Sequence, residues 1–213
     1  MEITKLTTQA KNPERVNLFV DGKFYRGLDK IVSLRLGLKV GLTLNPHLVK
    51  QLETQTADND AWEYALKSLQ YSAKSTSMLK KKLTERFGEV MAQETITKLT
   101  TSKILNDTEL AENLVSRYME QGMKSRRQIT TWFKLKGFEK EVVDQAVEPI
   151  DEPYEKEVAL KLARKKYSQL DKDMDWFEKR DKVSMHLAQK GFAYGVIRQI
   201  VMEDVLSNAK HLA

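Results

Sequence analysis

Residues 129–143 read ITTWFKLKGFEKEVV, and residues 183–197 read VSMHLAQKGFAYGVI, so one pattern occurs twice at a distance of 54 positions. In each copy an apolar pair with helical spacing precedes a Lys-Gly-Phe step, at Lys136-Gly137-Phe138 and Lys190-Gly191-Phe192. A second apolar pair follows the step in both copies. Recurrence at a fixed period is typical of repeat proteins, in which copies of one small unit pack on each other.

A more divergent copy lies 50 positions upstream, where Leu79 and Leu83 correspond to Ile129 and Phe133. Arg86-Phe87-Gly88 stands there in place of the Lys-Gly-Phe step. Apolar stripes with a period of about 3.6 residues lie on both sides of each copy, so each unit is predicted to contain three helices. A unit of about 50 residues buries little surface by itself, and neighbouring units are therefore expected to pack together.

The N-terminal region has a different period. Val16, Leu18 and Val20 alternate with other residues, and Asp21-Gly22 follows them. This pattern predicts a β-hairpin with a type I′ turn, and residues 3–7 are expected to supply a further strand. A short helix is expected over residues 29–36, and Asn45-Pro46 is expected to begin another.

The sequence thus predicts a mainly α fold: a tandem array of three three-helix repeats, elongated and curved, with a small N-terminal β-hairpin module. The predicted domains are residues 1–57, 58–105, 106–150 and 151–213. Three helix starts are expected from capping residues followed by Glu or Gln three positions later, at Asp60, Asn106 and Ser125. Helix ends are expected at three glycines that suit the left-handed conformation, Gly122, Gly137 and Gly191.

The composition excludes most catalytic chemistry. The chain has no cysteine, and it lacks the glycine-rich phosphate loops, the zinc-binding helix motif and the nucleophile elbow of common enzyme families. The three histidines, His47, His186 and His211, do not have the spacing of metal ligands, and His186 is expected to be half-buried. We therefore expect no catalytic residue, no metal site and no cofactor.

Other conspicuous residues have structural interpretations. Asp171, Asp173 and Asp175 resemble part of a calcium loop, but Trp176 and Lys182 occupy the positions that need Gly and Glu. Trp132 and Trp176 are expected to pack in the core or between repeats. The absence of cysteine, of a signal sequence and of a long apolar segment favours a cytoplasmic protein that does not enter a membrane.

Positive charge is concentrated in the first half of the chain. The net charge is +6, and residues 1–50 carry nine Lys or Arg against four Asp or Glu, whereas residues 106–148 carry seven against eight. Clustered bases attract polyanions or acidic protein surfaces, although a solvated surface is the alternative explanation. The candidate partner-binding residues are Lys80, Lys81, Lys82, Arg86, Lys124, Arg126 and Arg127.

Several stretches of this sequence resemble the RecX regulators of the bacterial RecA recombinase. They are residues 62–66 leading to Leu79 and Leu83, residues 104–111, and residues 129–138. The most specific part is the step Leu105-Asn106-Asp107 followed about 25 residues later by the Lys-Gly-Phe step. The resemblance extends over about residues 58–205, and the N-terminal strands look like the extension of Gram-positive members.

The resemblance implies a protein that binds the RecA nucleoprotein filament and suppresses its growth, ATP hydrolysis and strand exchange, with roles in DNA repair and homologous recombination. It implies a regulator, not an enzyme, and it supplies no catalytic residue. We expect a monomer whose partner is the RecA filament, with single- or double-stranded DNA as a further candidate partner. The alternative hypothesis is an autonomous DNA-binding helical module, favoured by the excess of basic residues in the first half of the chain.

Overall fold

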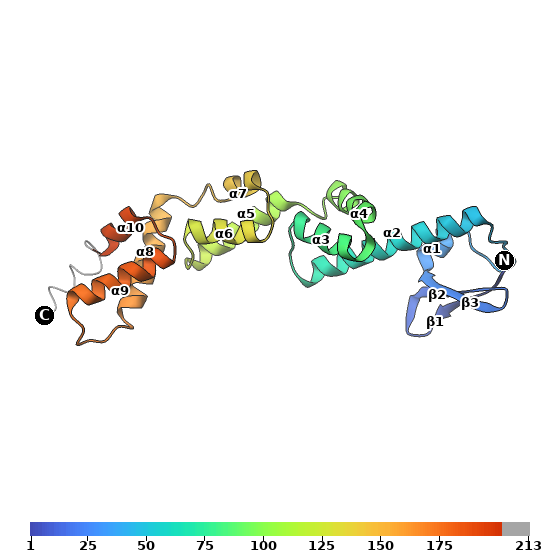
Figure 1. The fold of residues 1–213 in the computed structure, drawn as a ribbon, viewed down its shortest axis with the longest axis horizontal. Coiled ribbons are helices and arrows are strands. Elements are labelled where there is room, and N and C mark those ends of the chain that lie inside the picture. Colours follow the sequence, from blue (N-terminus) through green and yellow to red (C-terminus); the bar gives the residue numbers. More distant parts are fainter. Residues whose placement is uncertain (202–213) are drawn as a thin grey trace. The chain divides into compact units, whose positions relative to one another are not determined.

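The computed structural model describes residues 1–201 (Figure 1). His211 and the end of the third predicted repeat, residues 202–213, lie outside the described residues. Contacts divide the chain into two units. The first contains residues 1–74 and 79–104, and the second contains Ser75–Met78 together with the chain from Leu105 onward.

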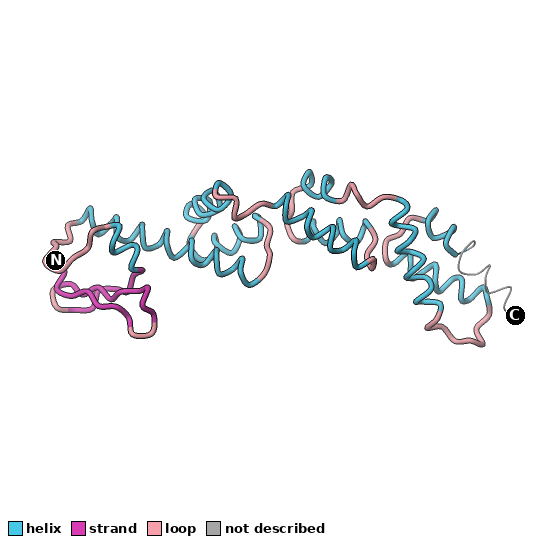
Figure 2. The backbone as a smooth tube through the Cα atoms, turned by 180° about the vertical axis from the view of Figure 1, so that it is seen from behind, coloured by secondary structure: helices cyan, strands magenta, loops and turns pink. Residues whose placement is uncertain are grey.

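The first unit begins with an antiparallel sheet in the order β1-β2-β3 (Figure 2). Its strands are β1 (Ile3–Gln9), β2 (Asn12–Val20) and β3 (Lys23–Asp29). Asp21 and Gly22 have φ angles of 49° and 78°, as a type I′ turn requires, so the predicted hairpin is confirmed. The further strand expected over residues 3–7 is present as β1, and it pairs with β2.

One face of this sheet packs on the next two helices. Ile3, Leu18 and Leu28 are fully buried, and they form a core with residues of α1 (Lys30–Arg35) and α2 (Pro46–Tyr71). The side chain of Asp29 accepts a hydrogen bond from the N–H of Ile31, and thereby caps α1. The predicted short helix is therefore confirmed.

The helix α2 begins where the sequence indicated but is longer than expected. Asn45 caps it by accepting a hydrogen bond of 2.8 Å from the N–H of Leu48, with Pro46 in the first turn. The predicted start at Asp60 is wrong, because this residue lies in the middle of α2. Ala61 and Ala65 continue the buried stripe of the same helix, and the Asp60 carboxylate lies 3.6 Å from the guanidinium of Arg15.

Two further helices follow, α3 (Thr76–Phe87) and α4 (Glu89–Thr101). Leu79 and Leu83 are fully buried on α3, and Leu99 is fully buried on α4, which also packs against α2. Gly88 precedes α4 with a φ of 83°, so the divergent Arg86-Phe87-Gly88 step also contains a left-handed glycine. The second half of α2, α3 and α4 form a three-helix group.

The second unit contains two more groups of three helices. The first consists of α5 (Asp107–Gln121), α6 (Arg126–Leu135) and α7 (Lys140–Ala146), and the second of α8 (Glu152–Tyr167), α9 (Trp176–Gln189) and α10 (Tyr194–Gln199). Asn106 and Ser125 cap α5 and α6, which confirms both predicted starts. The helices α5, α6 and α9 end close to Gly122, Gly137 and Gly191, all with positive φ angles.

Each of these groups has its own core. Phe133 and Phe138 pack edge to face, with ring centroids 4.9 Å apart, and Ile129 and Val143 surround them. Leu187 and Phe192 are buried at the equivalent places of the next group. The predicted mainly α fold with repeated three-helix groups is confirmed. The domain boundaries after residues 57, 105 and 150 stay predictions.

Candidate partner-binding surface

The Lys-Gly-Phe turn of the last group is joined to the start of α6 by a hydrogen bond between Ser125 and Lys190. The buried Ser125 hydroxyl donates to the carbonyl oxygen of Lys190 over 2.6 Å, and also accepts from the N–H of Gln128 over 3.2 Å. The Gln128 side chain in turn accepts from the Ser125 N–H, which completes a capping box. One side chain therefore both caps α6 and anchors the turn after α9.

We call the contact between the start of α6 and the turn after α9 the α6–α9 joint. At Gly191 the backbone of this turn lies close to Arg127 of α6. Gly191 has a φ of 85°, and a Cβ atom placed on it would lie 3.0 Å from Cδ of Arg127 and 3.2 Å from its Cβ. A side chain at this position would be strained by its backbone and crowded by Arg127. The motif glycine is therefore required both for the turn and for the contact with α6.

An equivalent joint forms around Gly137. The hydroxyl of Ser75 donates to the carbonyl oxygen of Lys136, and a Cβ atom on Gly137 would lie 2.9 Å from Oγ of Ser77. The N–H and the hydroxyl of Thr76 both donate to the carboxylate of Asp107. The repeated motif thus marks repeated joints, which the sequence pattern alone did not reveal.

A cleft of about 460 Å³ opens beside the α6–α9 joint. Three cationic side chains line it, together with neutral polar and apolar ones, and no carboxylate of the described residues does. We call it the cationic cleft; its lining residues are Lys124, Arg127, Gln128, Thr131, Trp132, Leu135, Ala188, Gln189, Lys190 and Gly191. Two of the predicted partner-binding residues, Lys124 and Arg127, therefore come together with a third base, Lys190, that the sequence did not single out.

The charges of this cleft are not neutralised within the described part of the chain. Lys124, Arg127 and Lys190 form no ion pair among residues 1–201, although Nζ of Lys124 lies 3.7 Å from the ring centroid of Tyr118. Burial first, and then the charges of Lys190 and Lys166, lower the pKa of the half-buried His186. The local field is therefore positive, and it favours an anionic partner.

Arg126 has a different role from its neighbour. Its N–H donates to the carboxylate of Glu155 over 2.7 Å, and its guanidinium donates to the carbonyl oxygen of Ile150 over 3.2 Å. It does not line the cationic cleft. Its contacts connect the start of α6 to the segment that leads into α8.

The remaining candidates lie on α3 in the first unit, and they differ in their freedom. Nζ of Lys80 is 2.8 Å from the carboxylate of Glu89, and this contact is the main cause that lowers the pKa of Glu89. The guanidinium of Arg86 stacks over Tyr64, 4.8 Å from its ring centroid. Lys81 and Lys82 are exposed and form no ion pair among the described residues. Only the last two are thus fully available to a partner.

Sequence reasoning missed one buried cation, Lys74. Its ammonium donates to the carbonyl oxygens of Ser68 and Ser72 and to the hydroxyl of Ser72, at the end of α2. Burial first, and then the charge of Lys82, lower its pKa. Cations near a helix C-terminus satisfy its free carbonyl groups, so Lys74 is a capping residue.

Trp132 forms one wall of the cationic cleft and is packed, as predicted. Its ring makes edge contacts with Tyr118 and Phe133, at centroid distances of 5.7 and 5.2 Å. Trp176 is half-buried against the core of the last group, which agrees with its prediction.

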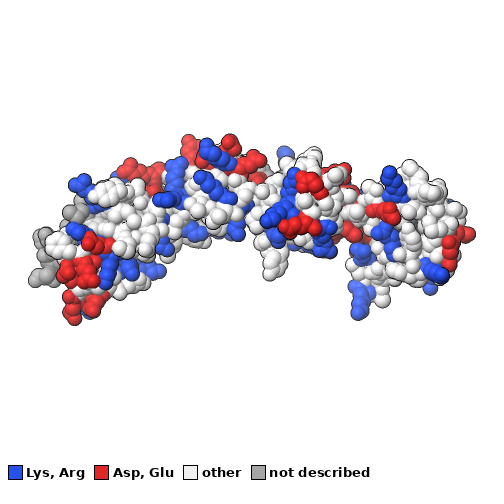
Figure 3. Space-filling model, viewed as in Figure 1, with Lys and Arg blue, Asp and Glu red and all other residues white. Residues whose placement is uncertain are grey.

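Figure 3 shows that acidic side chains gather over α7 and over the loop between α8 and α9.

Residues 1–201 contain no group of His, Asp or Glu that could hold a metal ion. In the same part of the chain, no helix is both long and apolar enough to cross a membrane.

Comparison with known proteins identifies the family. Residues 1–45 match the domain described as the regulatory protein RecX N-terminal domain, and residues 154–201 match the RecX third three-helix domain. Regulatory protein RecX of Clostridioides difficile (strain 630) is 30% identical over 199 residues, 93% of either chain. The chain belongs to the RecX family. RecX of Clostridium botulinum (strain Eklund 17B / Type B) is 29% identical over 96% of either chain.

Solved RecX structures share this fold. A crystal structure of regulatory protein RecX matches with a TM-score of 0.72 and 24% identity, over 93% of this chain and 98% of the other. The crystal structure of RecX from Lactobacillus salivarius matches with a TM-score of 0.62 and 24% identity, over 69% of this chain and 96% of the other. The fold of this chain is thus shared with solved members of the RecX family.

Proposed function

We propose that this RecX protein binds the RecA nucleoprotein filament and inhibits its recombinase and ATPase activities. It acts as a cytoplasmic monomer through contact alone, performs no reaction and needs no cofactor. Membership of a family of regulatory proteins supports this proposal. The observation that carries it for this chain is the cationic cleft, where three bases that form no ion pair within residues 1–201 line an open hollow.

The repeated construction suits a contact function. Each three-helix group offers a small surface, and groups joined in one chain bind a polymeric partner with avidity, because each contact raises the effective concentration of the next. Occupying several protomers at once would bar DNA from the filament or hold the protomers in a geometry that does not hydrolyse ATP. Weak individual contacts, such as those of Lys81 and Lys82, are then sufficient.

The test is the DNA-dependent ATPase of RecA with increasing amounts of this protein. We expect inhibition that saturates below one molecule per RecA protomer, since each molecule spans several protomers. Absence of inhibition at stoichiometric excess would reject the proposal. Strand exchange measured in parallel shows whether recombination falls together with ATP hydrolysis.

Autonomous binding to DNA is the second candidate function. It is favoured by the unpaired bases Lys81, Lys82, Arg127 and Lys190, which could contact phosphates. Mobility shifts on single- and double-stranded DNA over a salt series test it, because phosphate contacts weaken steeply with salt. Tight, salt-sensitive binding without RecA would favour this function over the first.

A further inference from the structure

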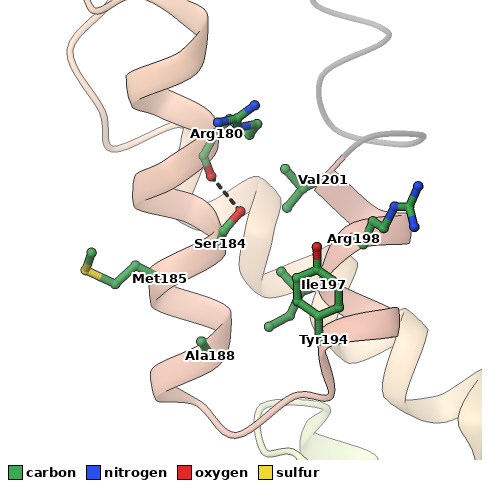
Figure 4. Close-up of a pocket in the computed structure, with 8 residues that line it drawn as sticks. All are labelled: Arg180, Ser184, Met185, Ala188, Tyr194, Ile197, Arg198 and Val201. Carbon is green, nitrogen blue, oxygen red and sulfur yellow. Dashed lines mark hydrogen bonds between the residues drawn. The ribbon is translucent and has the colours of Figure 1, made fainter.

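The cationic cleft lies next to a second hollow, and Ala188 lines both. We call the second hollow, of about 640 Å³, the apolar groove (Figure 4). Its lining residues are Arg180, Ser184, Met185, Ala188, Tyr194, Ile197, Arg198 and Val201. Figure 4 shows residues of α9 along one side, and Tyr194, Ile197, Arg198 and Val201 along the other. The two hollows meet at Ala188, and their linings come mainly from α6, α9 and residues 194–201.

Exposed apolar side chains are concentrated on this surface. Between Leu105 and Val201 the large exposed apolar residues are Met123, Leu135, Phe177, Met185 and Tyr194. Three of these five line the two hollows, and Leu135 and Tyr194 are 80% and 79% exposed. Apolar side chains gathered in an exposed hollow mark a contact site, because solvent exposure of such a patch is unfavourable.

The charge on this surface has one sign. Lys124, Arg127 and Lys190 line the cationic cleft, Arg180 and Arg198 line the apolar groove, and among residues 1–201 no carboxylate lines either hollow. Of the five cations, only Arg180 forms an ion pair within residues 1–201, with the adjacent Asp181 at 2.8 Å. The described part of this surface therefore carries an excess of positive charge together with apolar side chains, and a complementary partner supplies both carboxylates and apolar side chains.

We propose that the cationic cleft and the apolar groove together bind an acidic segment of the partner protein that carries large aliphatic side chains. This inference rests on the proposed function, and it names the chemistry of the contact. The carboxylates lie beside Lys124, Arg127 and Lys190. The aliphatic side chains pack against Met185, Tyr194 and the floor around Ala188.

Two other occupants fit less well. Nucleic acid would find bases for its phosphates, but the apolar lining is mostly aliphatic, with Tyr194 as its one exposed ring among the described residues. The ring of Trp132 is already covered by Tyr118, Phe133 and Lys136. Residues 202–213 of this chain carry Glu203, Asp204 and Leu206 in sequence, so they compete as an occupant of similar chemistry. The experiment below separates these occupants.

The first measurement uses isotope-labelled full-length protein and two short synthetic peptides, without RecA. One peptide contains Asp, Glu and Leu, and its counterpart has Lys in place of every acid. We expect the acidic peptide alone to shift the indole N–H signal of Trp132 and the backbone signals of Ala188 and Gly191. Equal effects of both peptides, or shifts confined to other residues, would overturn the proposal.

Substitution of Ala188 tests both hollows at once. Ala188 is exposed on α9, so the fold tolerates a longer side chain there. Ala188→Glu adds a carboxylate to the cleft, and we expect it to weaken binding of the acidic peptide at least about tenfold. Ala188→Lys, which has a similar length, is expected to weaken it much less. Equal losses in both variants would contradict an acidic ligand.

Matched controls identify the occupant. Lys140→Gln on α7 changes the net charge by one unit, as Ala188→Glu does, at a residue that lines neither hollow, and it is expected to leave peptide affinity within about twofold. Oligothymidylate that displaces the acidic peptide from Trp132 would overturn the proposal in favour of nucleic acid. Glu203→Lys with Asp204→Lys would overturn it in favour of this chain's own segment if it strengthened peptide binding at least about tenfold.

The last measurement is affinity for the RecA filament. If the unaltered protein binds the peptide but does not bind RecA, the proposed function fails while the surface stands. If it binds RecA and Ala188→Glu does so equally well, the surface is not the contact and this inference fails.

Discussion

The hydroxyl of Ser125 lies 2.6 Å from the carbonyl oxygen of Lys190, 65 residues later in the chain. The same hydroxyl caps α6, so one buried side chain serves a local and a distant hydrogen bond. Ser75 and Lys136 repeat the relationship over 61 residues. In both cases the serine at the start of a helix is hydrogen-bonded to the glycine-containing turn of the following group.

Loss of the Ser125 hydroxyl should destabilise the protein. Ser125→Ala leaves the buried N–H of Gln128 and the carbonyl of Lys190 without this partner, and we expect a loss of about 1–3 kcal/mol in the free energy of unfolding. Urea unfolding followed by circular dichroism measures it. Ser184→Ala is the control, because the Ser184 hydroxyl donates only to the carbonyl of Arg180 within α9. Equal effects of the two substitutions would show that the joint adds nothing.

A side chain at Gly191 should cost more than one at Gly122. Both glycines have positive φ angles, but a Cβ atom at Gly191 would lie 3.0 Å from Arg127, whereas at Gly122 the nearest atom is Nζ of Lys161 at 3.5 Å. We expect about 1–2 kcal/mol for Gly122→Ala and a larger loss for Gly191→Ala. Thermal unfolding compares the two variants. A smaller loss at Gly191 would refute the close-approach argument.

The four bases on α3 should not contribute equally to partner binding. Lys81→Glu with Lys82→Glu reverses the two charges that form no ion pair among the described residues. We expect weaker filament binding, with a smaller loss of affinity at high salt. The free energy of unfolding should stay within about 0.5 kcal/mol of that of the unaltered protein. Fluorescence anisotropy on RecA filaments measures the affinity. Arg86→Glu also loses its stacking on Tyr64, so it should lower stability as well.

This prediction has a control in the same protein. Lys140→Glu changes an exposed charge on α7 that pairs only with Asp144, at 3.7 Å. It should leave filament affinity unchanged. If it weakens binding as much as reversal at Lys81 and Lys82 does, net charge and not the α3 surface governs the affinity.

Acidification should destabilise the last three-helix group through His186. Its pKa is lowered in the folded protein, so below the ordinary value of about 6.5 the unfolded chain binds more protons than the folded one. Stability therefore rises with pH through the window that ends near that value and falls on acidification. His186→Gln cannot bind the proton, and we expect it to reduce the loss of stability between neutral and mildly acidic pH. Urea unfolding at both pH values is the measurement, and an unchanged difference would exclude His186.

Features of the fold that depend on local chemistry were predictable. Asp21-Gly22 fixes a turn, and Asn45, Asn106 and Ser125 accept hydrogen bonds from amides three residues away, so neighbouring residues contain the whole signal. The helix start predicted at Asp60 was wrong because the same local pattern also occurs inside a helix. A capping pattern inside a helix that has already begun has no free amides to satisfy, and Asp60 instead contacts Arg15 from β2.

The candidate surface was only partly predictable. Lys124 and Arg127 were identified because they are clustered bases in the sequence. Lys190 and its neighbours Ala188 and Gln189 join them only through the Ser125–Lys190 hydrogen bond and the approach of Gly191 to Arg127. A contact between residues so far apart in the chain produces no periodic pattern in the sequence. Ser75 and Ser125 occupy the same position in two copies of the repeat, and this was the one hint in the sequence that both serines form similar contacts.

The atoms that accept the serine hydroxyls at both joints belong to the main chain. Every amino acid carries such a carbonyl, so the lysine before each motif glycine can be exchanged during evolution without loss of the connection. Substitutions beside a joint can therefore change the charge of the exposed surface and the partner that it binds. The hydrogen bond that connects neighbouring helix groups is kept, because it needs only the main-chain carbonyl.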